Sequence, residues 1–216
     1  MTAKVRKMKL TYIGHSCFKL EHEGYSVIFD PYEDGSVPGL LPVRERADMV
    51  LCSHDHHDHR AKENVELIHS RKNPFAITEL DTFHDDRGGS LRGKNMIRIL
   101  DDGHMRIAHM GDQGCDLTKA QTEQLRGLDL VMVPVGGYYT IDARWAKRIM
   151  DQLHPGIIVP MHYRGEGFGF EVLETVEKFT DLYAAEAVIH EGSSIEIAKI
   201  TASRVAVMEP LSASRK

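Results

Sequence analysis

The stretch Cys52–Arg60, CSHDHHDHR, constrains the fold more than any other part of the sequence. Four histidines and two aspartates occupy the six residues from His54 to His59. The preceding residues 47–53 have the apolar composition of a buried strand, which predicts a loop held by a rigid element. Imidazole and carboxylate are the ligands that zinc and related divalent ions prefer. The cluster therefore predicts a metal site, with an exposed polar loop that binds metal only adventitiously as the alternative.

Spacing divides the cluster into two groups. His54 and His56 are separated by one residue, so an extended chain can point both side chains the same way. Asp58 and His59 follow after the chain turns and can face a second point. Two remaining members are out of phase and are expected to face outward or to support the ligands: Asp55 and His57.

A single loop cannot close a metal site, so further ligands are expected at other strand ends. Each candidate follows a predicted strand and precedes a loop: His84 in TFHDD, Asp112 in HMGDQG and His162 in VPMHY. A lone histidine usually belongs to the surface or the core. Three polar residues in the same position relative to three strands instead favour metal ligation.

In order and in residue type, the whole series resembles the metal ligands of the metallo-β-lactamase superfamily. The surrounding segments YIGHSCFKLE, VIFDPY, FHDD, HMGDQG, PVGGYYTID and PMHY are similar to the small metal-dependent hydrolases related to ascorbate-6-phosphate lactonase. The similarity runs from Leu10 to His190. It implies a four-layered αββα sandwich of two mixed β-sheets, with the metals at one edge between the sheets.

The resemblance also implies a role for each donor. One ion would be held by three histidines: His54, His56 and His84. A second ion would be held by a mixed set: Asp58, His59 and His162. Asp112 would bridge the two ions. Asp30, in FDPY, matches an early aspartate that supports the cluster loop, although its place between a strand and a proline also fits a simple turn.

The order of predicted elements suits mixed sheets covered by helices. Strands are predicted over residues 9–15, 17–22, 25–30, 47–53, 74–78, 129–137 and 156–163, and a hairpin over 95–112. Helices are predicted over residues 61–70, 117–128, 142–153 and 170–180. Short strands are expected from Ala187 onward. The sequence contains no repeat or linker, so we predict one domain over residues 1–216.

A bound metal ion lowers the pKa of water from about 15.7 to about 7. Two ions that share one water favour a bridging hydroxide, which attacks a carbonyl or phosphoryl centre. We therefore expect a metal-dependent hydrolase of a small ester, lactone or phosphoester. Asp58 or Asp112 could orient the nucleophile. His15, in GHS, is a further catalytic candidate because relatives carry a similar Gly-His, with a histidine bonded into a turn as the alternative. His109 is expected to support the site or to pack in the hairpin.

Other residues near the predicted ligands have two interpretations each. Arg87, Arg92 and Lys94 flank GGSLRGK and could grip an anionic substrate such as a sugar phosphate, or could belong to a solvated loop. Tyr138 and Tyr139 could donate hydrogen bonds to a developing oxyanion, or could serve packing.

Composition narrows the partners and the location. The formal charge of −5 argues against a general nucleic-acid binder, so a small-molecule substrate is expected, anionic if the basic loop contributes. No apolar run is long enough to span a membrane, and the start lacks the apolar core of a secretory signal. Three scattered cysteines, Cys17, Cys52 and Cys115, indicate free thiols in a reducing compartment. A cytoplasmic protein is expected, and its oligomeric state cannot be inferred from the sequence.

Two other functions stay open at this point. An RNA or DNA phosphodiesterase of the same fold would be expected to carry a nucleic-acid-gripping arm and a more basic surface. A non-catalytic metal-binding protein would keep the site without turnover. Two divalent metal ions are expected in either enzyme, and histidine-rich ligation suits zinc, although manganese, iron and nickel accept the same donors.

Overall fold

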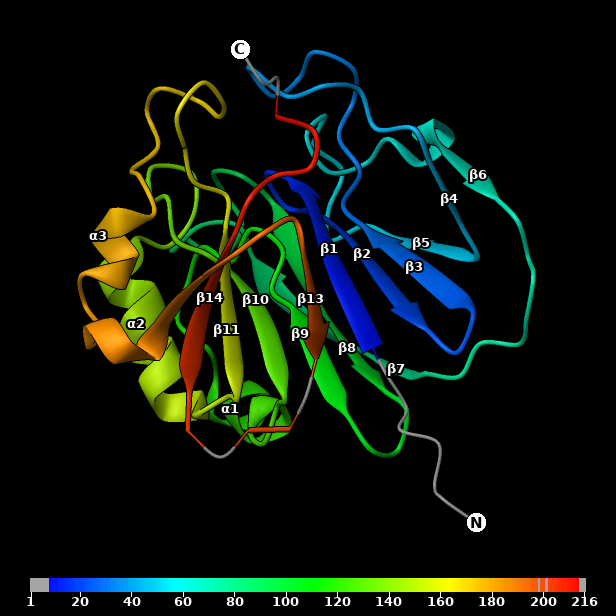
Figure 1. The fold of residues 1–216 in the computed structure, drawn as a ribbon. Coiled ribbons are helices and arrows are strands. Elements are labelled where there is room, and N and C mark those ends of the chain that lie inside the picture. Colours follow the sequence, from blue (N-terminus) through cyan, green and yellow to red (C-terminus); the bar gives the residue numbers. More distant parts are fainter. Residues whose placement is uncertain (1–7, 198, 201, 214–216) are drawn as a thin grey trace.

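Two mixed β-sheets packed face to face form the centre of the molecule (Figure 1). The structure is a computed structural model and describes residues 8–197, 199–200 and 202–213. The five-stranded sheet has the order β13 (Ser194–Ile197), β1 (Met8–Gly14), β2 (Cys17–His22), β3 (Tyr25–Phe29) and β5 (Met49–Leu51). The seven-stranded sheet has the order β12 (Val188–Glu191), β14 (Arg204–Met208), β11 (Ile157–Met161), β10 (Leu130–Pro134), β9 (Arg106–His109), β8 (Lys94–Asp101) and β7 (Ala76–Phe83).

The main hydrophobic core lies between these sheets. Leu10 of β1 and Val27 of β3 belong to the same buried cluster as Ile97 of β8 and Val131 of β10. Every residue of β10 is buried, because this parallel strand has the other sheet on one face and helices on the opposite face. The apolar run that predicted a strand over residues 129–137 therefore reflects burial on both sides.

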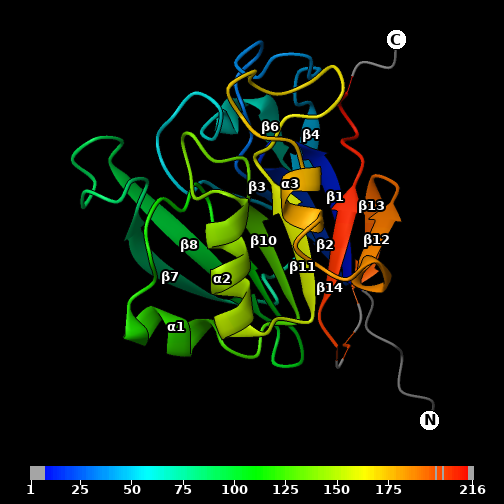
Figure 2. The same cartoon turned by 90° about the vertical axis from the view of Figure 1, so that its left-hand side faces the viewer.

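Three helices cover the outer face of the seven-stranded sheet (Figure 2). They are α1 (Lys119–Leu125), α2 (Ala143–Leu153) and α3 (Glu177–Thr180). The Asp142 side chain caps α2 by accepting a hydrogen bond from the Trp145 amide, and the helix buries Ala146, Ile149 and Leu153. Within the described ranges, no helix has the length and apolar character needed to cross a membrane.

The outer face of the five-stranded sheet is covered mainly by loops. A second hydrophobic cluster joins Ile13 and Ile28 of this sheet to Tyr32, Val43 and Val65. Val65 belongs to a two-stranded parallel sheet formed by β4 (Glu45–Ala47) and β6 (Val65–Leu67). Short 3-10 turns, η1 (Lys62–Asn64) and η2 (Ala185–Ala187), complete the described elements. The predicted sandwich of two mixed sheets is confirmed, and its fourth layer consists of loops and the two-stranded sheet in place of α-helices.

Two of the predicted helices are wrong: one is absent, and the other is much shorter than predicted. Residues 61–70 form η1 and β6 instead of a helix, because the backbone of residues 65–67 pairs with β4. The helix predicted over residues 170–180 is restricted to α3. The chain before α3 forms hydrogen bonds with other segments: the Glu174 amide donates to the Gly136 carbonyl, and the Arg164 amide donates to the Glu174 carbonyl. These contacts hold the backbone away from helical geometry.

Strand direction determines where the functional loops meet. β1 and β3 both run antiparallel to β2, and β5 runs parallel to β3. β7 and β9 both run antiparallel to β8, while β10 and β11 run parallel to β9. The carboxyl ends of β1, β3 and β5 therefore share one edge of the first sheet, and those of β7, β9 and β11 share one edge of the second.

The strand predicted over residues 47–53 is interrupted at Asp48, a buried carboxylate. Its oxygens accept hydrogen bonds from the amide and hydroxyl of Ser26 on β3, at 2.9 and 3.2 Å, and from those of Ser70, at 2.5 and 2.6 Å. Burial alone would raise the pKa of Asp48, but the hydrogen bonds from Ser70 and Ser26 lower it to about 2. Asp48 thus ties the loop after β6 to the edge of the five-stranded sheet.

Replacing Asp48 with asparagine is expected to lower the free energy of unfolding by about 1–3 kcal/mol at neutral pH, because buried donors lose a charged acceptor. The pKa of Asp48 is lowered on folding, so its stabilisation is complete above the unfolded value of about 3.9 and is lost as the pH falls toward the folded value. Urea unfolding of both proteins across this pH range measures the difference, which should be constant near neutral pH and should narrow in acid.

The exposed Asp181 provides a matched control, and Asp181→Asn should change stability by no more than about 0.5 kcal/mol. A difference between wild-type protein and Asp48→Asn that does not narrow at low pH would contradict this role for the Asp48 carboxylate.

Candidate metal centre

The predicted ligands all follow the carboxyl ends of strands. The histidine and aspartate cluster follows β5, His84 follows β7, Asp112 lies just beyond β9, and His162 follows β11. Because these ends share the edges of the two sheets, segments up to about a hundred residues apart in sequence converge there. The structure brings all seven predicted ligands together at this edge.

Three histidines form one group of donors. His54, His56 and His84 each offer a ring nitrogen, and these atoms lie within 4.8 Å of one another. His54 Nε2 lies 3.0 Å from His56 Nδ1. Such an all-imidazole set suits zinc and neighbouring transition metals. The group coincides with the first predicted metal site.

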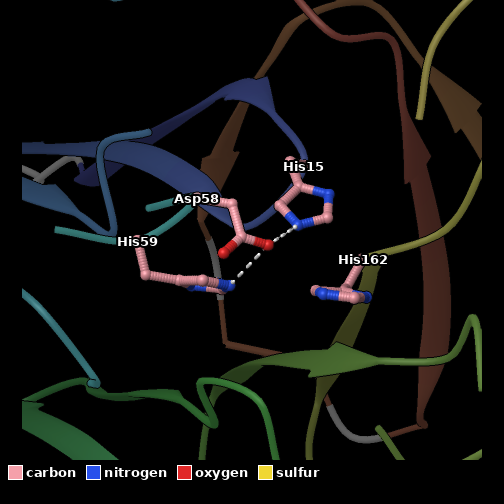
Figure 3. A group of neighbouring side chains, drawn as sticks. All are labelled: His15, Asp58, His59 and His162. Carbon is pink, nitrogen blue, oxygen red and sulfur yellow. Dashed lines mark hydrogen bonds and ion pairs between the residues drawn. The ribbon is translucent and has the colours of Figure 1, made fainter. Parts of the chain in front are cut away.

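A second group joins Asp58, His59 and His162 to His15 (Figure 3). Their donor atoms also lie within 4.8 Å of one another. The His15 ring lies 4.1 Å from that of His162 between centroids, and His15 Nε2 is 3.1 Å from Asp58 Oδ2. Three of these residues match the second predicted metal site. His15, predicted as a catalytic candidate, directly contacts that site through Asp58.

Asp112 lies between the two groups. Its Oδ2 atom is 3.0 Å from His84 Nε2, 3.1 Å from His162 Nε2 and 3.2 Å from His59 Nε2. His54 Nε2 lies at 3.9 Å. One buried carboxylate oxygen thus faces imidazoles from both groups, which is the geometry expected of a bridging ligand.

The buried polar atoms of the cluster fit a divalent cation. Four of them form no hydrogen bond or ion pair with the described residues: His15 Nδ1, His84 Nδ1, Asp112 Oδ1 and His162 Nδ1. A buried polar group without a partner costs about 1–3 kcal/mol. Asp112 Oδ1 belongs to the predicted bridging ligand, so a cation would satisfy an atom that the protein leaves unsatisfied. The donor set and its burial are consistent with a resident metal.

Mutual charge shifts the pKa values of the cluster. Burial alone would raise the pKa of Asp112, but His162, His59 and His84 hold it well below its usual value. Burial lowers the pKa of His54 to about 3, with His59 adding to the effect. Burial alone would also lower the pKa of His59, but the Asp112 and Asp58 carboxylates raise it well above its usual value. The carboxylates that stabilise a proton on His59 would equally stabilise a cation.

Asp30 supports the cluster loop from beneath. Its carboxylate accepts hydrogen bonds from the Ser53 amide at 2.7 Å and the Ser53 hydroxyl at 2.6 Å, and its Oδ2 atom lies 2.8 Å from His59 Nδ1. Ser53 Oγ in turn lies 2.9 Å from His54 Nδ1. Asp30 therefore orients one histidine of each group, directly or through Ser53. Its Oδ2 atom also lies 3.9 Å from Nδ1 of His109, a buried side chain.

Asn95 holds the backbone of Asp112 in place. This buried side chain accepts a hydrogen bond from the Asp112 amide at 2.9 Å and donates one to the Met110 carbonyl at 2.9 Å. Between them, Gly111 adopts a φ of +56°, and a Cβ atom there would lie 2.2 Å from Asn95 Oδ1. Asn95 was not identified from sequence, because its only local signal is a polar residue at an inward position of β8.

Three site residues at strand ends adopt left-handed backbone conformations. Asp30, His15 and His162 have φ values of 42°, 57° and 55°. Side chains other than glycine rarely adopt this conformation, which persists where surrounding contacts hold it. The His162 amide donates to the His15 carbonyl at 3.0 Å, so these two turns stabilise each other across the sheets.

A cavity of about 440 Å³ opens over the centre. It is lined by predicted ligands of both groups, by Asp55 and His57 of the cluster loop, and by four residues from other loops: Ser36, Arg92, Tyr139 and Phe170. Tyr139 lines the cavity, whereas Tyr138 is 65% exposed. Phe170 was not identified from sequence, because its segment was predicted to be helical. The cavity has the size of a small-molecule site.

The two residues predicted to be out of phase line the cavity but belong to neither donor group, and their side chains are largely exposed. His57 is 71% exposed, and its Nδ1 atom lies 2.9 Å from Glu33 Oε2. Asp55 is 87% exposed and pairs with Arg60 at 3.1 Å. The loop is therefore braced on its outer side by ion pairs, while its other histidines face the centre.

Comparison with known proteins identifies the class. Residues 9–162 match the family model of the beta-lactamase superfamily domain, so the chain belongs to that superfamily. Within it, a UPF0173 protein of Pyrococcus abyssi is 29% identical over 188 residues, 75% of this chain and 86% of that protein. A UPF0173 metal-dependent hydrolase of Hyperthermus butylicus is 28% identical over 191 residues, 70% of this chain and 82% of that protein.

Comparison with solved structures also places the chain in this superfamily. A Thermotoga maritima protein, described as a Zn-dependent hydrolase of the metallo-beta-lactamase superfamily, is 33% identical, with a TM-score of 0.72 over 93% of this chain and 98% of that chain. The predicted resemblance is confirmed, and the chain stands among the metal-dependent hydrolases of the superfamily.

Removing the Asp30 carboxylate should weaken metal binding. Asp30→Ala is expected to lower zinc affinity by about 10- to 100-fold, because His59 and the Ser53–His54 pair lose the group that orients them. Zinc titration in competition with a chromogenic chelator measures the affinity. Asp55→Ala, which changes an exposed carboxylate of the same loop, is the control and should bind zinc as the wild-type protein does. Equal affinities for Asp30→Ala and wild-type protein would contradict the supporting role.

Proposed function

We propose that the protein hydrolyses a small ester, lactone or phosphoester with two divalent metal ions, zinc being the best match to the donors. One ion would be held by three histidines: His54, His56 and His84. The other would be held by a mixed set: Asp58, His59 and His162. Asp112 would bridge them. The observation that most supports this proposal is the position of Asp112 Oδ2, which lies 3.0–3.2 Å from ring nitrogens of both groups.

The protein's own residues would bind the metal ions and orient the attacking water. Divalent ions in this centre would supply Lewis-acid activation of water and of the substrate oxygen that gains charge. Asp58, with its exposed edge toward the cavity, is placed to orient the attacking water through a hydrogen bond. His15 holds Asp58 from behind at 3.1 Å and is completely buried, so it acts by positioning that carboxylate.

The cavity favours a small substrate. Its volume of about 440 Å³ lies within the range typical of small-molecule sites. Tyr139 and Phe170 supply aromatic walls with their ring centroids 6.0 Å apart. The alternative of a polynucleotide phosphodiesterase receives no support from the net charge of −5.

Chelation should abolish activity. Protein stripped of metal is expected to lose ester, lactone or phosphodiester hydrolysis by at least about 100-fold, because water keeps its ordinary pKa without the ion. Adding zinc or manganese should restore the rate. His56→Ala should be inactive, whereas His104→Ala, which removes an exposed histidine outside both donor groups and the cavity, should retain wild-type activity and metal content.

A metal-loaded protein that turns over none of these small substrates would contradict the proposed hydrolase. Cleavage of RNA or single-stranded DNA by that protein would then favour the nuclease, and inertness toward all substrates would favour a non-catalytic metal-binding protein.

His15 can be tested separately. His15→Ala is expected to weaken the mixed metal site by about 10- to 100-fold, because Asp58 loses its buried partner, and to leave the three-histidine site intact. Metal analysis after dialysis against a weak chelator should find one ion per chain in the variant and two in the wild-type protein. Two ions retained in the variant would overturn the positioning role.

A further inference from the structure

The loop that follows His84 is held by one buried carboxylate. Asp85, 3% exposed, accepts hydrogen bonds from four backbone amides at 2.7–3.0 Å. The donors are the amides of Arg87, Gly89, Leu91 and Arg92. An internal scaffold of this kind fixes a loop that has no regular secondary structure. Residues 85–92 therefore form an ordered arm beside the metal centre, which we name the Asp85 arm.

The Asp85 arm ends with Arg92 at the cavity. The Arg92 guanidinium donates a hydrogen bond to the Tyr138 carbonyl at 3.1 Å and lies over the Tyr139 ring, 5.7 Å from its centroid. Cation–π contacts at this distance hold a guanidinium without neutralising it. Arg92 lines the cavity over the centre and a neighbouring cavity of about 320 Å³. Backbone and head group are both fixed, so the side chain is preorganised.

The Arg92 charge has no carboxylate partner among the described residues. Other arginines near the site do: Arg60 pairs with Glu33 and Asp55, and Arg98 pairs with Glu79. A guanidinium has five N–H donors, and the Tyr138 carbonyl accepts only one bond from Arg92. The free donors fit the two oxygens of a carboxylate or phosphate in bidentate geometry.

The structure distinguishes among the three basic residues of this region. Arg87 is exposed and lines neither cavity, although it lies on the same arm. Lys94 is exposed and lines only the smaller cavity, which Asp81 also lines. Only Arg92 of the three lines the cavity that contains the predicted ligands.

We propose that Arg92 is a specificity-determining residue that binds an oxyanion of the substrate, a carboxylate or phosphate group away from the bond that is cleaved. Asp85 is the positioning residue that presents it. The substrate is then an anionic ester, lactone or phosphoester. This inference rests on the proposed hydrolase, because two divalent ions would outweigh the charges of the three carboxylates that line the cavity, Asp55, Asp58 and Asp112, and leave it positive.

The first test compares two esters with the same leaving group. 4-Nitrophenyl hemisuccinate carries a carboxylate at the end of its acyl chain, and 4-nitrophenyl butyrate is neutral. Arg92→Gln is expected to lower kcat/KM for the hemisuccinate by about 10- to 100-fold, the range for a lost charged hydrogen bond, and to change the butyrate value by less than about threefold. Arg87→Gln, the matched control on the same arm, should leave both values unchanged. Equal losses for both esters in Arg92→Gln would overturn the inference.

A binding measurement separates this inference from the hydrolase proposal. Calorimetry on zinc-loaded protein should detect succinate and phenyl phosphate, each bound about 10- to 100-fold more weakly by Arg92→Gln, and no binding of succinamide. A larger loss for one anion identifies carboxylate or phosphate as the preferred group. If wild-type protein binds these anions through Arg92 but cleaves neither ester, the oxyanion site stands and ester hydrolysis fails. Equal anion affinities in Arg92→Gln and wild-type protein overturn the oxyanion site, whatever the hydrolysis result.

The positioning role of Asp85 has its own readout. Asp85→Ala should raise KM for the hemisuccinate with little change in kcat, and should preserve the metal content, because His84 keeps its strand-end position. Asp85→Asn keeps one acceptor oxygen and should restore part of the loss. A fall in metal content together with equal losses for both esters would instead make Asp85 a support of His84 and overturn its role in presenting Arg92.

Discussion

The buried carboxylate of Asp112 among the imidazoles of His59, His84 and His162 is the interaction on which the rest of the site depends. An ionised group taken out of water is strongly destabilising unless charge or hydrogen bonds compensate it. Here the compensation comes from side chains at the ends of different strands in two sheets. The site can form only if both sheets are complete and correctly packed, so formation of the metal centre depends on the whole fold.

Residues that hydrogen-bond to the predicted ligands, or to their backbone, fix the orientation of the donor groups. Asp30 reaches the cluster loop through Ser53, and Asn95 holds the Asp112 backbone, so each group of donors is oriented by hydrogen bonds from strands. The left-handed turns at His15 and His162 hydrogen-bond to each other across the sheets. Backbone conformations of this kind are retained where neighbouring contacts overdetermine them. Rigid sheets thus position loops whose own sequences carry no regular structure.

The cavity has a floor of metal-ligand candidates and walls that come from other segments. The walls are formed by four residues outside the cluster loop: Ser36, Arg92, Tyr139 and Phe170. In the proposed enzyme the floor would carry the chemistry and the walls the selectivity, because only the walls would contact parts of the substrate remote from the reacting bond. Membership of the superfamily therefore leaves the substrate open.

The sequence by itself determined the ligand candidates, because polar residues directly after apolar strands are a local pattern, and its resemblance to the superfamily implied the two-sheet architecture. Only the tertiary structure decided that His15 lies against Asp58, that Asn95 and Asp85 hold backbone in place, and that residues 61–70 contain a strand. Each of these depends on contacts between segments far apart in the chain. Such contacts override local helical spacing, and no short-range pattern encodes them.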